Sequence, residues 1–120
     1  GVIVYSPIAR GLLTGKYKLG HKFPLDDQRR DHKAFAKEYV LKGVKVANEL
    51  SRWAKDHGRT GTELAIAWTL ATPGVTSAIC GAKNPDQALQ NAEAGSWSLT
   101  KTQLNEIEDL VVDYCIDTHV

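Results

Sequence analysis

The chain has 120 residues and a formal net charge of +1, so it has the size of one ordinary domain without a strong charge excess. It contains no basic run, no acidic tail and no interleaving of basic and aromatic residues, so we expect no nucleic-acid partner. No apolar stretch approaches the length that spans a bilayer and none resembles a signal peptide, so we expect no membrane partner and a cytoplasmic protein. Cys80 and Cys115 lack a paired spacing, which favours interior thiols over a disulfide or a metal site.

The N-terminal part of the chain is predicted to be a strand followed by a long loop. Residues 2–6 begin with the apolar run Val2-Ile3-Val4-Tyr5 and end before Pro7, which favours an extended, buried strand. Residues 7–33 are charged and interrupted by glycine and proline, which predicts a long surface loop of the kind that is functional or mobile. The chain contains no methionine and begins directly in a strand-like run, so we expect its true beginning to lie upstream.

Four helices and a second strand are predicted after the loop. Apolar residues recur every three or four positions over about 38–57, and a capping box of Thr60 and Glu63 opens a helix over 61–72. A mostly apolar and β-branched run predicts a strand over 75–80 that is buried on both faces. Helices over about 85–94 and 101–112 follow, and a second capping box of Thr100 and Gln103 opens the last one.

The junction between the second strand and the next helix is the clearest candidate binding site. Asn84 is a favourable N-cap, and the free backbone N–H groups of the helix start would attract an anion, to which Lys83 adds a cation. Three amide side chains follow at helical spacing and could read a flat heteroaromatic ring: Gln87, Gln90 and Asn91. Capping alone explains the same helix start and is the simpler interpretation of this motif by itself.

The order of elements predicts an α/β fold with parallel strands. Strands that alternate with helices are joined by right-handed crossovers, and a parallel sheet needs cover on both of its faces. Two strands are too few to close or to be covered in this way. We therefore expect the chain to lack part of its own fold.

Two separated segments resemble the aldo-keto reductases. Residues 1–17 are similar to the seventh strand of that family and the loop after it, and residues 63–68 and 74–91 are similar to its last barrel helix, eighth strand and cofactor-binding helix. The likeness spans about residues 1–110 and is strongest for the branch that includes the potassium-channel β subunits and bacterial relatives. The family fold is a (β/α)8 TIM barrel of roughly 250 residues, about twice this chain. The resemblance thus implies the C-terminal part of one such barrel, with its last two strands and their helices.

The resemblance also implies contacts to NADPH or NADP, which fall into four groups. Tyr5 holds the place of an aromatic residue that stacks on the nicotinamide. The loop that wraps the pyrophosphate is matched by Ser6, Pro7, Ile8, Ala9, Arg10 and the basic residue Lys16. The contacts beside the adenosine 2′-phosphate are matched by Gly81 and Lys83. The adenine readers are matched by Gln87, Gln90 and Asn91, with Gln90 in place of a frequent Glu. Either Arg29 or Arg30 could also meet the cofactor from the long loop.

No catalytic residue and no metal ligand is assigned. The family's catalytic Asp, Tyr, Lys and His lie on earlier strands, and no counterpart occurs in this sequence. We interpret the histidines as solvated: His21, His32, His57 and His119. We find no partnered lysine for Tyr17, Tyr39 or Tyr114, and we interpret Trp53, Trp68 and Trp97 as packing residues.

Two functions from different classes remain open. The first is the C-terminal, cofactor-binding part of an NADPH-dependent oxidoreductase, which reduces a small-molecule carbonyl only when the N-terminal strands complete the barrel. The second is a non-catalytic module, derived from the same family, that self-associates or binds a partner through its open sheet. In both cases we expect a homo-oligomer or a missing N-terminal half, and no turnover by this chain alone.

Overall fold

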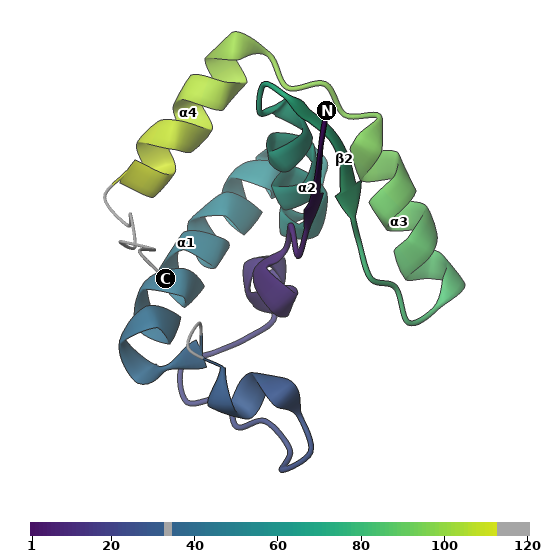
Figure 1. Ribbon diagram of the computed structural model, residues 1–120. Helices are drawn as coiled ribbons and strands as arrows, with labels where there is room; N and C mark the ends of the chain where they lie inside the picture. Colours follow the sequence, from purple (N-terminus) through teal and green to yellow (C-terminus); the bar gives the residue numbers. More distant parts are fainter. Residues whose placement is uncertain (33–34, 113–120) are drawn as a thin grey trace.

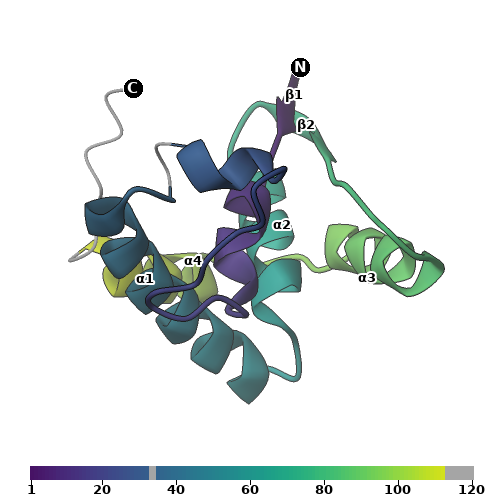
Figure 2. The ribbon, with the colours of Figure 1, turned by 90° about the horizontal axis from the view of Figure 1, so that it is seen from below.

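A computed structural model describes residues 1–32 and 35–112 of the chain (Figure 1). In chain order the elements are the strand β1 (Val2–Tyr5), the 3₁₀ helices η1 (Ala9–Thr14) and η2 (Gln28–Asp31), the helices α1 (Lys37–Asp56) and α2 (Gly61–Ala71), the strand β2 (Val75–Ile79), and the helices α3 (Pro85–Gly95) and α4 (Lys101–Val112). Strand β2 packs against α2 and pairs with β1, while α1 and α4 lie on one side of α2 and α3 lies on the other. Figure 2 shows the same separation from below.

The sheet is parallel and two-stranded, and one of its faces is open. Val4 pairs with Ala78, and Tyr5 pairs with Ile79. Side chains alternate between the two faces of a strand, so Ile3, Tyr5 and Ile79 share one face, where they are 66, 78 and 61% exposed. The prediction that both strands are buried is therefore wrong for this chain. Their apolar composition suits cover on both sides, but among the described residues the principal cover comes from α2, which packs against β2.

The core of the chain lies between α1, α2 and α4. Leu50 and Ala54 of α1, Leu64 of α2 and Ile107 of α4 are buried against one another. Three half-buried tryptophans pack around this cluster, as the sequence predicts: Trp53, Trp68 and Trp97. The helices thus form a packed scaffold on one side of the sheet.

Both predicted capping boxes are confirmed. Thr60 Oγ1 accepts a hydrogen bond from the Glu63 backbone N–H at 3.2 Å, and the Glu63 carboxylate accepts one from the Thr60 N–H at 2.7 Å. Thr100 and Gln103 make the same reciprocal pair at 3.1 and 2.9 Å. Each pair satisfies backbone N–H groups that a helix start would otherwise leave without partners. These local bonds set where α2 and α4 begin.

The long segment after β1 is more ordered than a plain surface loop. It folds into η1 and η2, and η1 packs against α1 and α2. Gly15 ends η1 with a φ of 76°, and a Cβ atom at this position would lie 2.6 Å from Ser51 Oγ in α1. Only glycine adopts this conformation readily and allows so close an approach. The start of the segment is therefore fixed on the helical scaffold.

His21 and His57 lie beside aromatic rings, and Cys80 is a free thiol. His21 and His57 are exposed, but the His21 ring lies 4.9 Å from the Tyr17 ring, and the His57 ring stacks on Trp53 at 3.8 Å. Cys80 is a half-buried free thiol whose pKa is raised by burial. Cys115, Tyr114, His119 and residue 33 lie outside the described residues.

Two kinds of feature are not found in the described ranges. None of the helices there is both long enough and apolar enough to pass through a membrane. Residues 1–32 and 35–112 also bring no three His, Cys, Asp or Glu side chains together in a group that could hold a metal ion.

Candidate functional site

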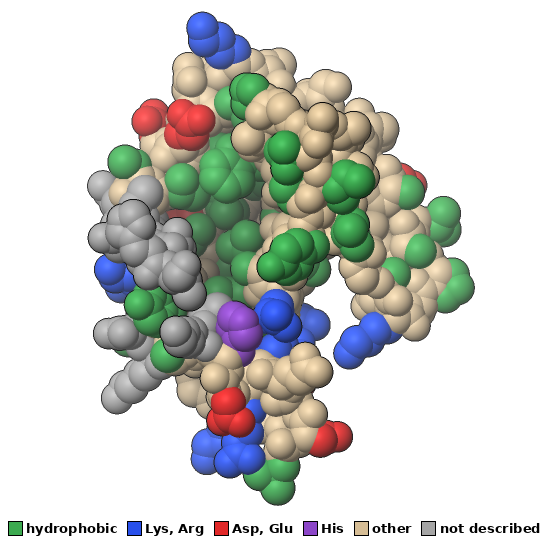
Figure 3. Space-filling model, viewed as in Figure 1, with side chains coloured by type: hydrophobic (Ala, Val, Ile, Leu, Met, Phe, Trp, Pro, Cys, Tyr) green, Lys and Arg blue, Asp and Glu red, His purple; other side chains and the backbone are tan. Residues whose placement is uncertain are grey.

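A polar groove of about 390 Å³ opens at the carboxyl edge of the sheet. Because β1 and β2 are parallel, the loops that follow them leave the sheet at this same edge. The lining comes from the loop after β1 with η1, the segment between β2 and α3, the first turns of α3, and single residues of η2 and α2. It comprises Ile8, Arg10, Gly11, Thr14, Lys16, Arg29, Thr62, Gly81, Ala82, Lys83, Gln87, Gln90 and Asn91. In Figure 3, Lys and Arg side chains gather on both sides of the hollow between α3 and the lower loop.

The loop after β1 enters the groove through an unusual backbone conformation. Ser6, Ala9 and Arg10 have φ angles of 55, 48 and 56°, a region that residues other than glycine rarely adopt. Such conformations cost on the order of 1–3 kcal/mol each and cluster at functional sites. Here they turn the chain sharply after the strand, and the turn places Ile8 and Arg10 in the groove lining.

The start of α3 uses its polar side chains to cap the helix. Asn84 Oδ1 accepts a hydrogen bond from the Gln87 backbone N–H at 2.9 Å. Gln87 Oε1 in turn accepts one from the Lys83 backbone N–H at 2.8 Å. The capping interpretation of this motif is therefore confirmed, and the same residues Lys83 and Gln87 also line the groove.

The other two predicted amides are also tied into the fold. Gln90 Nε2 donates to Thr60 Oγ1 at 3.3 Å, and Asn91 Nδ2 donates to the Gly81 carbonyl at 3.0 Å. Each amide keeps one further N–H and its carbonyl oxygen for another partner. Their orientation is thus fixed from one side, while both residues line the groove.

Four cationic side chains line the groove: Arg10, Lys16, Arg29 and Lys83. Within the described ranges, Arg29 is the one of the four that forms an ion pair, with Asp27. Hydrogen bonds from Arg29 hold the pKa of the Asp27 carboxyl well below its usual range, and the charge of Lys83 lowers it further. The same hydrogen bond raises the pKa of Arg29. The groove therefore carries an excess of positive charge and favours an anion.

The structure brings most of the predicted contacts together and leaves some outside. Tyr5, Ser6, Pro7 and Ala9 do not line the groove, and Tyr5 lies on the open face of the sheet. Of the two arginines left open by the sequence, Arg29 lines the groove and Arg30 lines a separate cavity. Sequence reasoning gave no role to four further lining residues: Gly11, Thr14, Thr62 and Ala82. Thr62 gives no local signal, because it lies inside an ordinary helix start.

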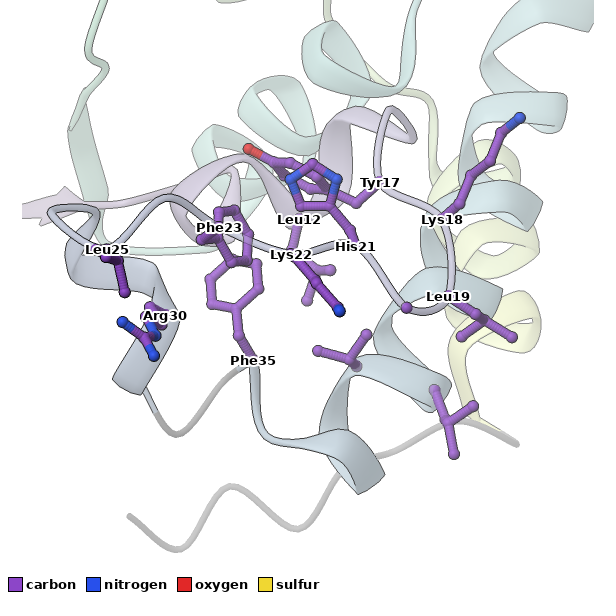
Figure 4. A pocket seen from close by; sticks show the side chains of 13 residues that line it. Leu12, Tyr17, Lys18, Leu19, His21, Lys22, Phe23, Leu25, Arg30 and Phe35 are labelled. Atoms are coloured by element: carbon purple, nitrogen blue, oxygen red, sulfur yellow. The ribbon is translucent and has the colours of Figure 1, made fainter.

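The separate cavity is larger, at about 700 Å³, but it is built differently (Figure 4). It lies beneath the long loop and is lined mainly by apolar side chains of η1, the loop and the start of α1. Phe23 and Phe35 lie together at one side and Leu19 at the other. None of its described lining residues comes from the carboxyl ends of the strands. We therefore take the smaller, charged groove as the candidate site.

We find no catalytic arrangement in the part of the chain that the structure describes. Tyr17 is 8% exposed, and its hydroxyl accepts a hydrogen bond from Arg29. No hydrogen bond joins a tyrosine hydroxyl to a lysine within these residues. The described lining of the groove thus consists of cationic and amide groups suited to binding, without a hydrogen-bonded tyrosine–lysine pair.

A parallel sheet with crossover helices and an anion-attracting groove at its carboxyl edge is the arrangement of nucleotide-binding α/β proteins. The model of the aldo/keto reductase family matches residues 1–112, and the chain belongs to this family. It is 31% identical over 110 residues to the aldo-keto reductase YhdN of Bacillus subtilis, which covers 91% of this chain and 33% of that protein. It is 30% identical over 108 residues to the aldo-keto reductase yakc [NADP(+)] of Schizosaccharomyces pombe, which covers 90% of this chain and 32% of that one.

A solved structure shows the same fold. The glycerol dehydrogenase AKR11B4 from Gluconobacter oxydans superposes with a TM-score of 0.82 at 30% identity, covering 99% of this chain and 37% of that one. A putative voltage-gated potassium channel subunit beta of Schizosaccharomyces pombe is 31% identical over 92% of this chain and 34% of its own length. The chain thus spans about a third of the length of the relatives it matches. Its two strands and their helices correspond to part of an aldo-keto reductase barrel, which they do not close.

Proposed function

We propose that this chain is the C-terminal, cofactor-binding part of an NADP(H)-dependent aldo-keto reductase, and that its groove binds the adenosine end of the cofactor. Bound NADPH supplies the hydride that reduces a carbonyl carbon, and this chain supplies binding groups. The observation that carries the proposal is the joint lining of one groove by Arg10, Lys16, Arg29 and Lys83. An NADP cofactor differs from NAD by the 2′-phosphate, for which a cationic cluster is the expected partner.

The amide side chains support the assignment of the adenosine end. Gln90 and Asn91 line the same groove as Lys83 and keep free donor and acceptor groups. A purine ring presents donors and acceptors on its edge, so an amide pair beside a phosphate site suits an adenosine 2′-phosphate. We also propose that reduction needs the N-terminal strands, because this sequence holds no counterpart of the family's catalytic Asp, Tyr, Lys and His.

Calorimetric titration of this chain with NADPH and NADH, with carbonyl reduction assayed in the same sample, tests the proposal. We expect NADPH to bind more tightly than NADH and no turnover to occur. Absence of NADPH binding, or equal binding of the two cofactors, would contradict the proposed site. Turnover would contradict the dependence on N-terminal strands.

A second candidate function is a self-associating module, and the open face of the sheet favours it. Ile3, Tyr5 and Ile79 place exposed apolar surface side by side on two paired strands. Surfaces of this kind are covered in proteins by further strands or by another molecule. Sedimentation velocity distinguishes the outcomes: an oligomer that Ile3→Lys dissociates supports self-association, and a monomer at all concentrations argues against it.

A further inference from the structure

The Asp27 carboxylate holds the Arg29 guanidinium at two points. Arg29 Nε donates to Asp27 Oδ1 at 2.9 Å, and Arg29 Nη2 donates to Asp27 Oδ2. Arg29 Nη1 donates to the Tyr17 hydroxyl, and the guanidinium carbon lies 4.8 Å from the centre of the Phe23 ring. Part of the edge and one face of the planar Arg29 guanidinium are thus engaged before any ligand is present.

Arg29 also lines the place where an anion would bind. Arg29 lines both the polar groove and a shallower hollow beside it, and Arg10 and Lys83 do the same. Asp26 and Asp27 line only the shallower hollow. The carboxylate therefore holds Arg29 from the hollow, while the polar groove stays lined by cations and amides.

We propose that Asp27 is a positioning residue for nucleotide recognition: it fixes Arg29 so that this side chain and Lys83 together hold the 2′-phosphate of NADP(H). The inference rests on the proposed function, and in it Asp27 touches no ligand itself. Fixing a long side chain beforehand removes an ordering cost that binding would otherwise have to meet. A fixed fork also matches the geometry of a phosphate better than a freely rotating cation does.

A carboxylate close to an anion site also repels the ligand, so the two effects oppose each other. Both charges of the pair are partly exposed, and water and salt weaken long-range repulsion at such a position. The Arg29 charge already offsets that of Asp27 at hydrogen-bond distance. We therefore expect the loss of positioning to outweigh the loss of repulsion.

The test is the binding of adenosine 2′,5′-bisphosphate and adenosine 5′-monophosphate, measured by calorimetry on this chain and on two matched variants. Asp27→Asn keeps an oxygen that can accept the Arg29 backbone N–H at the start of η2, but it loses the fork. Asp26→Asn makes the same charge change in the adjacent residue, whose side chain makes no hydrogen bond or ion pair with Arg29 in the described structure. A thermal unfolding midpoint within a few degrees of the parent shows that each variant is folded.

We expect Asp27→Asn to weaken the bisphosphate roughly 3- to 10-fold and to leave the monophosphate within about 2-fold, because only the former carries the 2′-phosphate. Asp26→Asn should leave both ligands within about 2-fold or bind them slightly more tightly. In an Arg29→Gln background, Asp27→Asn should cause no further loss, because a positioning residue acts only through the residue that it positions.

The outcomes separate this inference from the proposed function. Equal effects of Asp26→Asn and Asp27→Asn, or a further loss in the Arg29→Gln background, would overturn the positioning role and leave the cofactor groove standing. Equal weakening of the two nucleotides by Asp27→Asn would also overturn it. If the parent chain binds neither nucleotide, the proposed function and this inference both fail.

Discussion

Similar apolar side chains are buried in the helical scaffold and exposed on the open face of the sheet. In α2 and α4, Leu64 and Ile107 are 1 and 0% exposed, whereas Ile3 and Ile79 in the strands are 66 and 61% exposed. Both segments show apolar patterns in the sequence, so the pattern does not separate them. The difference lies in what packs against each segment. An apolar pattern therefore indicates that a segment suits a buried position. The described residues provide that burial for the helices and not for the open face of the sheet.

The sharpest test of this contrast compares one apolar truncation in each region. Leu64→Ala should lower the free energy of unfolding by about 2–5 kcal/mol, because it leaves a cavity in a packed core. Ile3→Ala should change it by less than about 1 kcal/mol, because the side chain is already largely exposed. Urea unfolding followed by far-UV circular dichroism measures both. Equal losses would show that another copy or partner buries the open face in solution.

A second test asks whether the positive charge of the groove is used for the 2′-phosphate. Lys83→Glu should weaken NADPH roughly 10-fold or more and weaken NADH less, because only NADPH carries the 2′-phosphate near the altered charge. Calorimetric titration of both cofactors measures the ratio. Lys101→Glu is the matched control, since it reverses a charge at the start of α4, away from the groove. Equal losses for the two cofactors would mean that Lys83 is merely solvated.

A third test compares the two capping boxes, one beside the groove and one away from it. Thr60→Ala should lower the free energy of unfolding by about 1–2 kcal/mol, because it removes the cap of α2 and the acceptor of Gln90 Nε2. Thr100→Ala should cost about 0.5–1 kcal/mol, because it removes only the cap of the more exposed α4. Chemical unfolding measures both. A larger loss of stability from Thr100→Ala than from Thr60→Ala would mean that the hydrogen bond from Gln90 in α3 to Thr60 at the start of α2 adds no stability.

The smallest expected effect concerns the pH dependence of the Asp27–Arg29 pair. Hydrogen bonds from Arg29 lower the pKa of the folded Asp27 carboxyl below its ordinary value of 3.8. Its contribution to stability is therefore fully present above about pH 4 and is lost as the pH falls through the lower folded pKa. The difference in stability between the parent and Asp27→Asn should be constant between pH 7 and pH 5 and should shrink near pH 3. A difference that changes between pH 7 and pH 5 would contradict the lowered pKa.

The sequence by itself determined the features that depend on neighbours a few residues away. The two capping boxes, the Asn84 cap and the apolar stripes of the helices join residues three or four positions apart, and all of them are found in the structure. Local bonds of this kind can be inferred from spacing because helix geometry fixes which side chains meet. The match of two separated segments also placed the chain in its family.

Only the tertiary structure decided the contacts that join distant segments. Arg29 rather than Arg30 reaches the groove, Gln90 bonds to Thr60 across 30 residues, and the strands keep an open face. No local spacing encodes these results, because each depends on how the loop after β1, the start of α3 and the helical scaffold pack together. The sequence thus contains the binding groups, and their meeting in one charged groove is a consequence of the parallel strands that bring two loops to the same edge.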